Sequence, residues 1–231
     1  MGNVNPDCVC KSWKVNPGEK IAIVGPTGAG KSSIINLISR FYEFQSGQIK
    51  IDDIPIKEIK LDSLRRHICT VSQDVFLFAA SVYDNITLFN PSIKIEEVVS
   101  AAKIIGVHDF ISKLPEGYYY NVKERGVMLS SGQRQLIAFL RAYIANPTIL
   151  VLDEATSSID SDSEELIQKA TAKITEGKTS IIIAHRLETI RRADRIIVMD
   201  EGQIVEEGSH EDLMKIKSGK YSQLYNIQFS S

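Results

Sequence analysis

Cysteine is scarce in this sequence of 231 residues, in which only Cys8, Cys10 and Cys69 occur. Three is an odd number for a chain of this size, so the sequence indicates a reducing compartment rather than a disulfide framework. Cys8 and Cys10 have the spacing of half a metal site, but no matching cysteine or histidine pair lies nearby. A metal-binding module is therefore not expected at this end of the chain.

Long apolar runs and an excess of charge of one sign are also missing. The longest apolar run covers residues 75–80, far short of the ~20 residues that span a bilayer, and the N-terminus shows no basic segment followed by an apolar one. Lysine and arginine (27) nearly balance aspartate and glutamate (29), which gives a net charge of −2 and a pI near 6.1. We expect a soluble domain with no nucleic-acid partner.

Apolar residues are plentiful, at 43% of the chain, which is enough for one large α/β domain with a substantial core. Three nearly continuous apolar segments, residues 20–24, 148–152 and 179–184, are typical of parallel strands buried on both faces. Residues 195–199 and 203–207 flank an Asp-Glu-Gly turn and therefore predict a hairpin.

Helical spacing of apolar residues dominates from about residue 80 to about residue 145. Only residues 118–122 form an ambiguous strand there, so we expect a helical subdomain inserted between strands of the sheet. Shorter strands are expected at residues 9–15, 47–51 and 69–72. The expected helices cover residues 33–41, 61–66, 95–105, 107–114, 133–144, 161–175, 210–216 and 220–225.

The segment between the first buried strand and the next helix has a phosphate-binding pattern. It fits G-x-x-x-x-G-K-[ST] with the residues Gly25, Pro26, Thr27, Gly28, Ala29, Gly30, Lys31 and Ser32. The glycines let backbone N–H groups turn inward around phosphate oxygens, and the helix that starts at Ser33 adds its positive dipole end. Lys31 would reach the β- and γ-phosphates, and the Ser32 hydroxyl would bind Mg²⁺. The alternative is a glycine turn that enters an ordinary helix.

Two acids follow the apolar strand that ends at residue 152. Asp153 and Glu154 emerge at its carboxyl end, where ligands bind in open α/β sheets. Asp153 is placed to hold Mg²⁺, and Glu154 could act as general base on an attacking water. Adjacent acids in this position can alternatively be a helix cap.

Two further polar residues end predicted strands. His185 follows residues 179–184 and can hydrogen-bond a γ-phosphate or orient a water molecule. The amide of Gln73 could ligate Mg²⁺ or position water. Each is alternatively an ordinary polar strand end, but the strand ends support one another as parts of one site.

A second anion-binding helix start is predicted at the sequence Leu129-Ser130-Ser131-Gly132-Gln133. Ser130 is a plausible N-cap of the helix that follows, and the free N–H groups of that helix start can bind an anion. One phosphate loop does not need a second such site in its own chain. A composite site shared by two chains does.

In order and spacing, these segments resemble the ATP-binding cassette (ABC) transporter family over residues 18–228. The matching segments are Walker A at residues 25–32, the Q-loop at Gln73, the LSGGQ signature at residues 129–133 with a serine in place of its first glycine, Walker B at residues 149–153, the catalytic glutamate at Glu154, the D-loop at residues 157–160 and the switch histidine at His185. The resemblance implies that Ser33 and residues 130–133 contact nucleotide in addition to Walker A.

Two details resemble the exporter subfamily, namely Glu124-Arg125-Gly126 as its X-loop and residues 81–86 as the segment after the Q-loop. The resemblance implies a P-loop NTPase core with an antiparallel β-subdomain and an inserted helical subdomain. It also implies that ATP and Mg²⁺ are held between Walker A of one domain and the signature of a second in a head-to-tail dimer. Hydrolysis then powers export across a membrane.

The implied partners are a second nucleotide-binding domain, identical or different, and the transmembrane domain of an exporter. These partners would hold the chain at the cytoplasmic face of a membrane, such as a bacterial inner membrane. One alternative is the poorly hydrolysing half of an asymmetric exporter, which the presence of Glu154 and His185 disfavours. Another is a soluble cassette ATPase that works on DNA or ribosomes, which the lack of a basic surface disfavours.

The family resemblance also bears on two less regular segments. Residues 75–80 are expected to face the coupling helices of the membrane domain, with burial in the core as the alternative. Exporter cassettes carry an aromatic residue on their first strand that stacks on adenine, but counting back from Lys31 reaches Met1. Trp13 lies too close to Lys31 and is expected to pack against the core. The chain is therefore expected to be truncated within its first strand and to lack its membrane domain.

Overall fold

The structure, a computed structural model, describes residues 12–154 and 161–229. The strands are β1 (Lys20–Val24), β2 (Lys50–Ile51), β3 (Ile54–Pro55), β4 (Ile68–Val71), β5 (Ile149–Asp153), β6 (Thr179–Ile183), β7 (Arg195–Asp200) and β8 (Gln203–Gly208). The α-helices are α1 (Lys31–Ile38), α2 (Leu61–His67), α3 (Val82–Thr87), α4 (Ile95–Ile105), α5 (His108–Ser112), α6 (Ser131–Ala145), α7 (Ser161–Ile174), α8 (Leu187–Arg191), α9 (His210–Lys215) and α10 (Lys220–Phe229). Two 3₁₀ turns are η1 (Gly117–Tyr119) and η2 (Glu124–Gly126).

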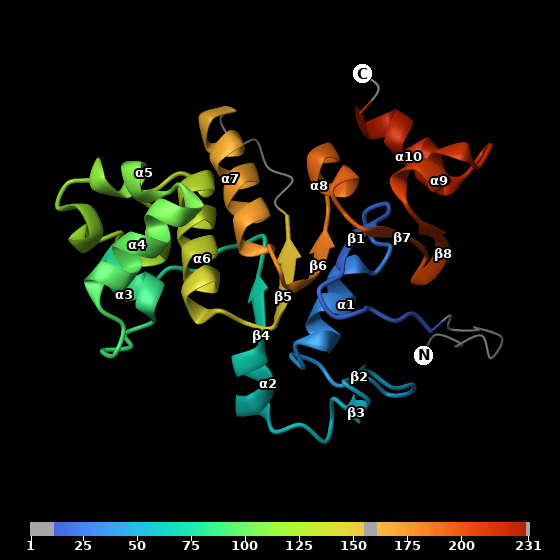
Figure 1. Cartoon of the computed structure of the whole chain (residues 1–231), viewed down its shortest axis with the longest axis horizontal. Coiled ribbons are helices and arrows are strands. Elements are labelled where there is room, and N and C mark those ends of the chain that lie inside the picture. The colour runs from blue at the N-terminus through green and yellow to red at the C-terminus, as the bar shows by residue number, and fades with distance from the viewer. Residues whose placement is uncertain (1–11, 155–160, 230–231) are drawn as a thin grey trace.

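A six-stranded sheet runs through the middle of the molecule in the order β4-β5-β6-β1-β7-β8 (Figure 1). Every neighbouring pair is parallel except β7 and β8, which form the predicted antiparallel hairpin. β2 and β3 make a separate two-stranded antiparallel sheet. The α/β fold class with a P-loop core is therefore confirmed, and the carboxyl ends of β1, β5 and β6 meet at one edge of the sheet.

Alternate residues of the buried strands point to opposite faces of the sheet, as the period of a strand requires. On one face, Ala22, Leu150 and Ile182 lie in the same cluster as Phe139 of α6 and Ile167 of α7. On the other face, two smaller clusters cover the sheet with α1, α2 and the segment around Ile56; they contain Ile21, Ile23, Ile181, Ile197, Ala29, Val151, Ile183, Ile35 and Leu64. Burial on both faces explains why these strands are apolar throughout.

The chain between β4 and β5 is mainly helical and contains α3, α4, α5 and α6. In Figure 1 these green helices gather to one side of the sheet, next to α7. The ambiguous residues 118–122 form no strand: Tyr118 and Tyr119 belong to η1, and Asn121 makes an isolated bridge to Ser81. The boundaries of a helical subdomain at about residues 80 and 145 remain a prediction.

Some predicted boundaries are wrong by a few residues. The helix expected at residues 33–41 begins at Lys31 and ends at Ile38, because Gly30 already occupies the N-cap and Arg40 has a positive φ of 50°. The strand expected at residues 47–51 is reduced to Lys50–Ile51. The strand expected at residues 69–72 begins and ends one residue earlier, so Gln73 lies beyond the strand end rather than on it.

At the N-terminal end, the residues described before β1 form no strand. Trp13 packs against Ile21 and its neighbours, as predicted. Cys8, Cys10, the position of the adenine-stacking residue and the start of the expected strand at residues 9–15 lie outside the described residues. Among the helices that the structure describes, none is both long and apolar enough to cross a membrane.

The apolar run at residues 75–80 is divided between the core and the surface. Leu77 is fully buried, whereas Phe76 and Phe78 are 56% and 43% exposed. Their rings meet edge to face at 5.2 Å, and Phe78 makes a similar contact with the exposed Phe89 at 5.6 Å. Burial in the core therefore holds for Leu77, whereas contact of this run with a membrane domain stays a prediction. Phe76, Phe78 and Phe89 together form an exposed aromatic patch.

Candidate phosphate-binding and catalytic site

The loop from Gly25 to Gly30 connects β1 to α1 at the carboxyl edge of the sheet. Gly25 has a φ of 154°, and a Cβ atom there would lie 2.2 Å from the carbonyl oxygen of Met199 on β7. No side chain fits so close to backbone, so β7 forces glycine at this position. Gly30 occupies the N-cap of α1 in a left-handed conformation and makes no side-chain cap hydrogen bond. The start of α1 therefore lacks a side-chain acceptor of its own, which suits an external anion.

The side chain of Lys31 folds back onto the start of this loop. Its Nζ donates to the carbonyl oxygens of Gly25 at 2.7 Å and Pro26 at 2.9 Å, and the residue is only 8% exposed. Burial lowers the pKa of Lys31, and the nearby Asp153 carboxylate opposes this shift. The amine thus lies inside the ring of the loop, where phosphate oxygens would be cradled.

Ser32 and Asp153 lie beside each other at the start of α1 and the end of β5. The Ser32 hydroxyl donates to Oδ2 of Asp153 at 3.4 Å. Burial raises the pKa of Asp153, while the Ser32 hydrogen bond and the Lys31 charge lower it. No group of three or more histidine, cysteine, aspartate and glutamate residues suited to a metal occurs in the described part of the chain. One carboxylate and one hydroxyl fit Mg²⁺, because this ion completes its shell with phosphate oxygens and water.

Glu154 is almost fully buried, at 3% exposed, and its carboxylate is held by one short segment of chain. Oε2 accepts from the backbone N–H groups of His185 at 3.1 Å and Arg186 at 3.2 Å. Oε1 accepts from the Thr189 hydroxyl at 2.5 Å. Burial raises the pKa of Glu154, and these three hydrogen bonds together with the Arg186 charge lower it.

His185 lies two residues beyond the end of β6, near the loop lysine. Burial lowers its pKa first, and the positive charge of Lys31 lowers it further. A neutral imidazole next to a cation can accept or donate a hydrogen bond toward a phosphate or a water. The structure thus brings Lys31, Ser32, Asp153, Glu154 and His185 to one edge of the sheet.

Gln73 was predicted to end a strand beside the other site residues, but it lies beyond the end of β4. It is exposed in a bend after β4. Its neighbour Asp74, which sequence reasoning missed, lies near enough for its charge to raise the pKa of Asp153. An acid directly after Gln73 was the available signal for this second carboxylate.

Residues 129–133, which were predicted to form a second anion site, lie at the start of α6. Ser130 is the N-cap, as predicted: its hydroxyl accepts from the Gln133 N–H at 3.1 Å, and the Gln133 side chain accepts from the Ser130 N–H at 3.0 Å. Gly132 is buried and Ser131 half-buried. Within the described ranges, no hydrogen bond or ion pair joins residues 129–133 to residues 25–32. In Figure 1, α7 and the central strands stand between α6 and α1.

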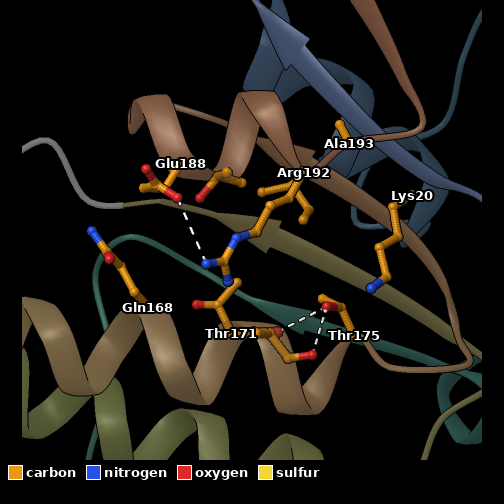
Figure 2. Close-up of a pocket in the computed structure, with 10 residues that line it drawn as sticks. Lys20, Gln168, Thr171, Thr175, Glu188, Arg192 and Ala193 are labelled. Carbon is orange, nitrogen blue, oxygen red and sulfur yellow. Dashed lines mark hydrogen bonds and ion pairs between the residues drawn. The ribbon is translucent and has the colours of Figure 1, made fainter. Parts of the chain in front are cut away.

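The predicted D-loop at residues 157–160 lies outside the described residues. A small pocket opens between α7 and α8. Figure 2 shows Gln168 and Thr171 of α7, with Thr175 just beyond its end, on one side and the ion pair between Glu188 and Arg192 on the other. Thr189 also lines this pocket, so the donor to Glu154 stands between the pocket and the carboxylate.

The comparisons with known proteins agree with this geometry. The sequence model of one family, described as ABC transporter, matches residues 11–157. The chain is 50% identical over 220 residues to an uncharacterized ABC transporter ATP-binding protein, YknV, of Bacillus subtilis (strain 168), covering 95% of this chain and 36% of that protein. It is also 50% identical over 214 residues to a putative multidrug export ATP-binding/permease protein of Staphylococcus aureus (strain NCTC 8325), covering 93% of this chain and 37% of that protein.

One solved structure has a similar fold. It is a bacterial Atm1-family ABC exporter with ATP bound, with a TM-score of 0.86 and 40% sequence identity. The match covers 95% of this chain and 38% of the exporter chain. The chain thus spans little more than a third of the length of the relatives that it matches. Its fold, its phosphate loop and these similarities together show that the chain belongs to the ABC transporter family.

Proposed function

We propose that this chain binds ATP with Mg²⁺ and hydrolyses it, and that the hydrolysis powers export of a substrate across a membrane. The observation that carries the proposal is the convergence of Lys31, Ser32, Asp153, Glu154 and His185 at one edge of the sheet. Phosphoryl transfer needs positioned charge and a positioned water more than covalent chemistry from the protein. This group of side chains can supply both.

Each side chain has a distinct proposed role. Residues 25–33 hold the phosphates through backbone N–H groups and the Lys31 ammonium. Ser32 and Asp153, with Gln73 as a further ligand or water-positioning group, would hold Mg²⁺, which neutralises phosphate charge when bound. Glu154 accepts a proton from the attacking water, since it is the carboxylate next to the metal ligand Asp153. His185 orients that water or hydrogen-bonds the γ-phosphate.

The complete site is proposed to form between two domains. The N–H groups of Ser131 and Gly132 at the start of α6 lie outside the cap formed by Ser130 and Gln133 and could bind an anion. In the described residues, the start of α6 makes no hydrogen bond or ion pair with the phosphate loop of its own chain. In a head-to-tail dimer, Ser130, Ser131, Gly132 and Gln133 of one domain would cover the nucleotide on the loop of the other. The second domain can be identical or different. ATP then joins the two domains, and its hydrolysis releases them.

The exposed aromatic patch is the proposed contact with a membrane domain. Phe76, Phe78 and Phe89 place three large apolar rings on the surface, an arrangement that favours a protein partner. The names of relatives refer to multidrug export and to an ABC exporter. We therefore place the chain at the cytoplasmic face of a membrane, held there by an exporter's transmembrane domain.

Ser130→Arg tests the shared site. We expect ATP binding to the single domain to be nearly unchanged, because Ser130 does not touch its own phosphate loop. ATP-driven dimerisation should be lost, because the larger side chain fills the space meant for the γ-phosphate of the other domain's nucleotide. Calorimetry measures the first quantity and analytical ultracentrifugation with ATP the second, using the Glu154→Gln background to retain the nucleotide.

The control is Ser100→Arg, which places the same side chain on an exposed position of α4. It should leave both binding and dimerisation unchanged. Because Ser130→Arg also removes the N-cap of α6, at a cost of about 1 kcal/mol, its thermal unfolding is recorded first. An unimpaired dimer of folded Ser130→Arg protein would contradict a site shared through α6.

A further inference from the structure

The Glu154 carboxylate is attached to the segment after β6 by an uncommonly complete set of donors. Two backbone N–H groups, of His185 and Arg186, donate to one oxygen, and the Thr189 hydroxyl donates to the other. Since the residue is 3% exposed, water cannot easily replace a lost donor. Thr189 is the only described side chain in this set, and therefore the only one that a substitution can remove cleanly.

Helix α8, which carries Thr189, is joined to α7 at its N-cap by an ion pair between Arg186 and Glu164 at 4.0 Å. The pocket in Figure 2 separates it from α7, and the ion pair between Glu188 and Arg192 lies within α8 and its C-cap rather than between the helices. Ile190 is buried and anchors α8 to the main core. The Arg186 N–H links the N-cap of α8 to the carboxylate at the end of β5, and the Thr189 hydroxyl adds a link from within the helix.

We propose that Thr189 is a positioning residue that ties Glu154 to the segment from His185 to α8, so that the proposed base and the proposed switch histidine move as one unit. This inference rests on the proposed function, in which Glu154 accepts the proton from water. The hydrogen bond that the Thr189 hydroxyl donates goes to Oε1 of Glu154. Thr189 acts through the carboxylate, whose direction it sets, and a misplaced base costs rate without weakening the hold on the phosphates.

The test is Thr189→Val, which keeps the shape of the side chain and removes its hydroxyl. We expect kcat for ATP hydrolysis by the full chain to fall about tenfold, the effect of one hydrogen bond to a charged group. KM for ATP should stay nearly unchanged, because the phosphate loop is not altered. Thr189→Ser keeps the donor and should restore most of kcat.

Thr171→Val is the matched control. Thr171 lines the same pocket and is buried, but its hydroxyl donates to the carbonyl oxygen of Ile167 in its own helix at 2.8 Å and does not reach Glu154. Its kcat should equal that of the unmodified chain. If Thr189→Val does not fold, Thr189→Ala removes the same hydroxyl with a smaller side chain and should give the same loss of kcat.

A double-variant comparison separates positioning from general support of the structure. In the Glu154→Gln background, Thr189→Val should cause no further loss of rate, whereas a merely structural role predicts the same factor in both backgrounds. An unchanged kcat for folded Thr189→Val, or an equal factor in both backgrounds, overturns the inference. An unchanged rate for Glu154→Gln alone instead overturns the proposed function on which the inference rests.

Discussion

Replacing Glu154 with Gln is expected to lower the rate of ATP hydrolysis at least ~10²-fold, the usual effect of losing a general base. The substitution keeps the size of the side chain but removes the proton acceptor. Lys31, Ser32 and Asp153 are unchanged, so ATP should still bind with similar affinity. In the proposed dimer, which hydrolysis would separate, the variant should also retain ATP and remain associated. Steady-state phosphate release and ATP calorimetry measure the two effects.

Glu96→Gln serves as the control for this substitution, because Glu96 is an exposed glutamate on α4. It should hydrolyse ATP at the rate of the unmodified chain. The amide in Glu154→Gln also brings an NH₂ group near the N–H donors of His185 and Arg186, so the folded state of the variant is checked by thermal unfolding. A folded Glu154→Gln protein with undiminished hydrolysis would show that another group takes the proton.

Replacing Lys31 with Ala is expected to weaken ATP binding at least about 30-fold. The ammonium lies inside the phosphate loop, and loss of one partner from a buried charged hydrogen bond costs about 2 kcal/mol or more. The apolar core should be little affected, because the amine of Lys31 lies in the phosphate loop, where it donates to the carbonyl groups of Gly25 and Pro26. Calorimetric titration with ATP and Mg²⁺ measures the affinity.

Lys103→Ala is the matched control, since Lys103 is an exposed lysine on α4 and its loss changes net charge equally. It should bind ATP normally. Unfolding of the nucleotide-free Lys31→Ala chain should remain cooperative, which shows that the loss of affinity is local. Equal ATP affinities for the Lys31→Ala and Lys103→Ala variants would remove the phosphate-loop assignment.

Sequence patterns predicted the central sheet well because its strands are buried on both faces. Residues 20–24, 148–152 and 179–184 could hardly be anything but core strands, and each lies within one residue of β1, β5 or β6. Parallel strands end at the same edge of a sheet. The sequence alone therefore predicts that Asp153, Glu154 and His185, which follow two such strands, lie together. Ser130 was predictable as an N-cap from its residue type ahead of a helical pattern.

Other features depend on tertiary contacts that local patterns do not contain. Thr189 is far from Glu154 in sequence, and a single threonine in a short helix gives no signal. Only the fold brings the Thr189 hydroxyl of α8 to the carboxylate that follows β5. The run at residues 75–80 looks uniformly apolar, yet Leu77 is buried while Phe76 and Phe78 are exposed. Which of these side chains is buried depends on the direction in which each one points along an irregular segment, and composition does not contain this information.

The boundary errors have a similar origin. Gly30 takes a left-handed conformation at the N-cap, so α1 begins at Lys31 and its first turn carries the phosphate-binding residues. The prediction counted these residues as loop. Gln73 was expected at a strand end, but β4 stops at Val71, which leaves the glutamine exposed on a bend. The earlier start of α1 and the earlier end of β4 do not alter the proposed site, because Lys31 and Gln73 stay at the same edge of the sheet.

The central claim, a hydrolytic site built from the phosphate loop of one domain and the α6 start of another, is tested most directly by ATP hydrolysis in a covalently linked pair. One domain carries Lys31→Ala and the other Ser130→Arg. One of the two sites then combines both lesions, whereas the other keeps an intact loop and an intact α6 start. The account predicts that this mixed pair hydrolyses ATP faster than pairs carrying either substitution twice. A mixed pair no faster than those two, with both domains folded and associated, would contradict a shared site.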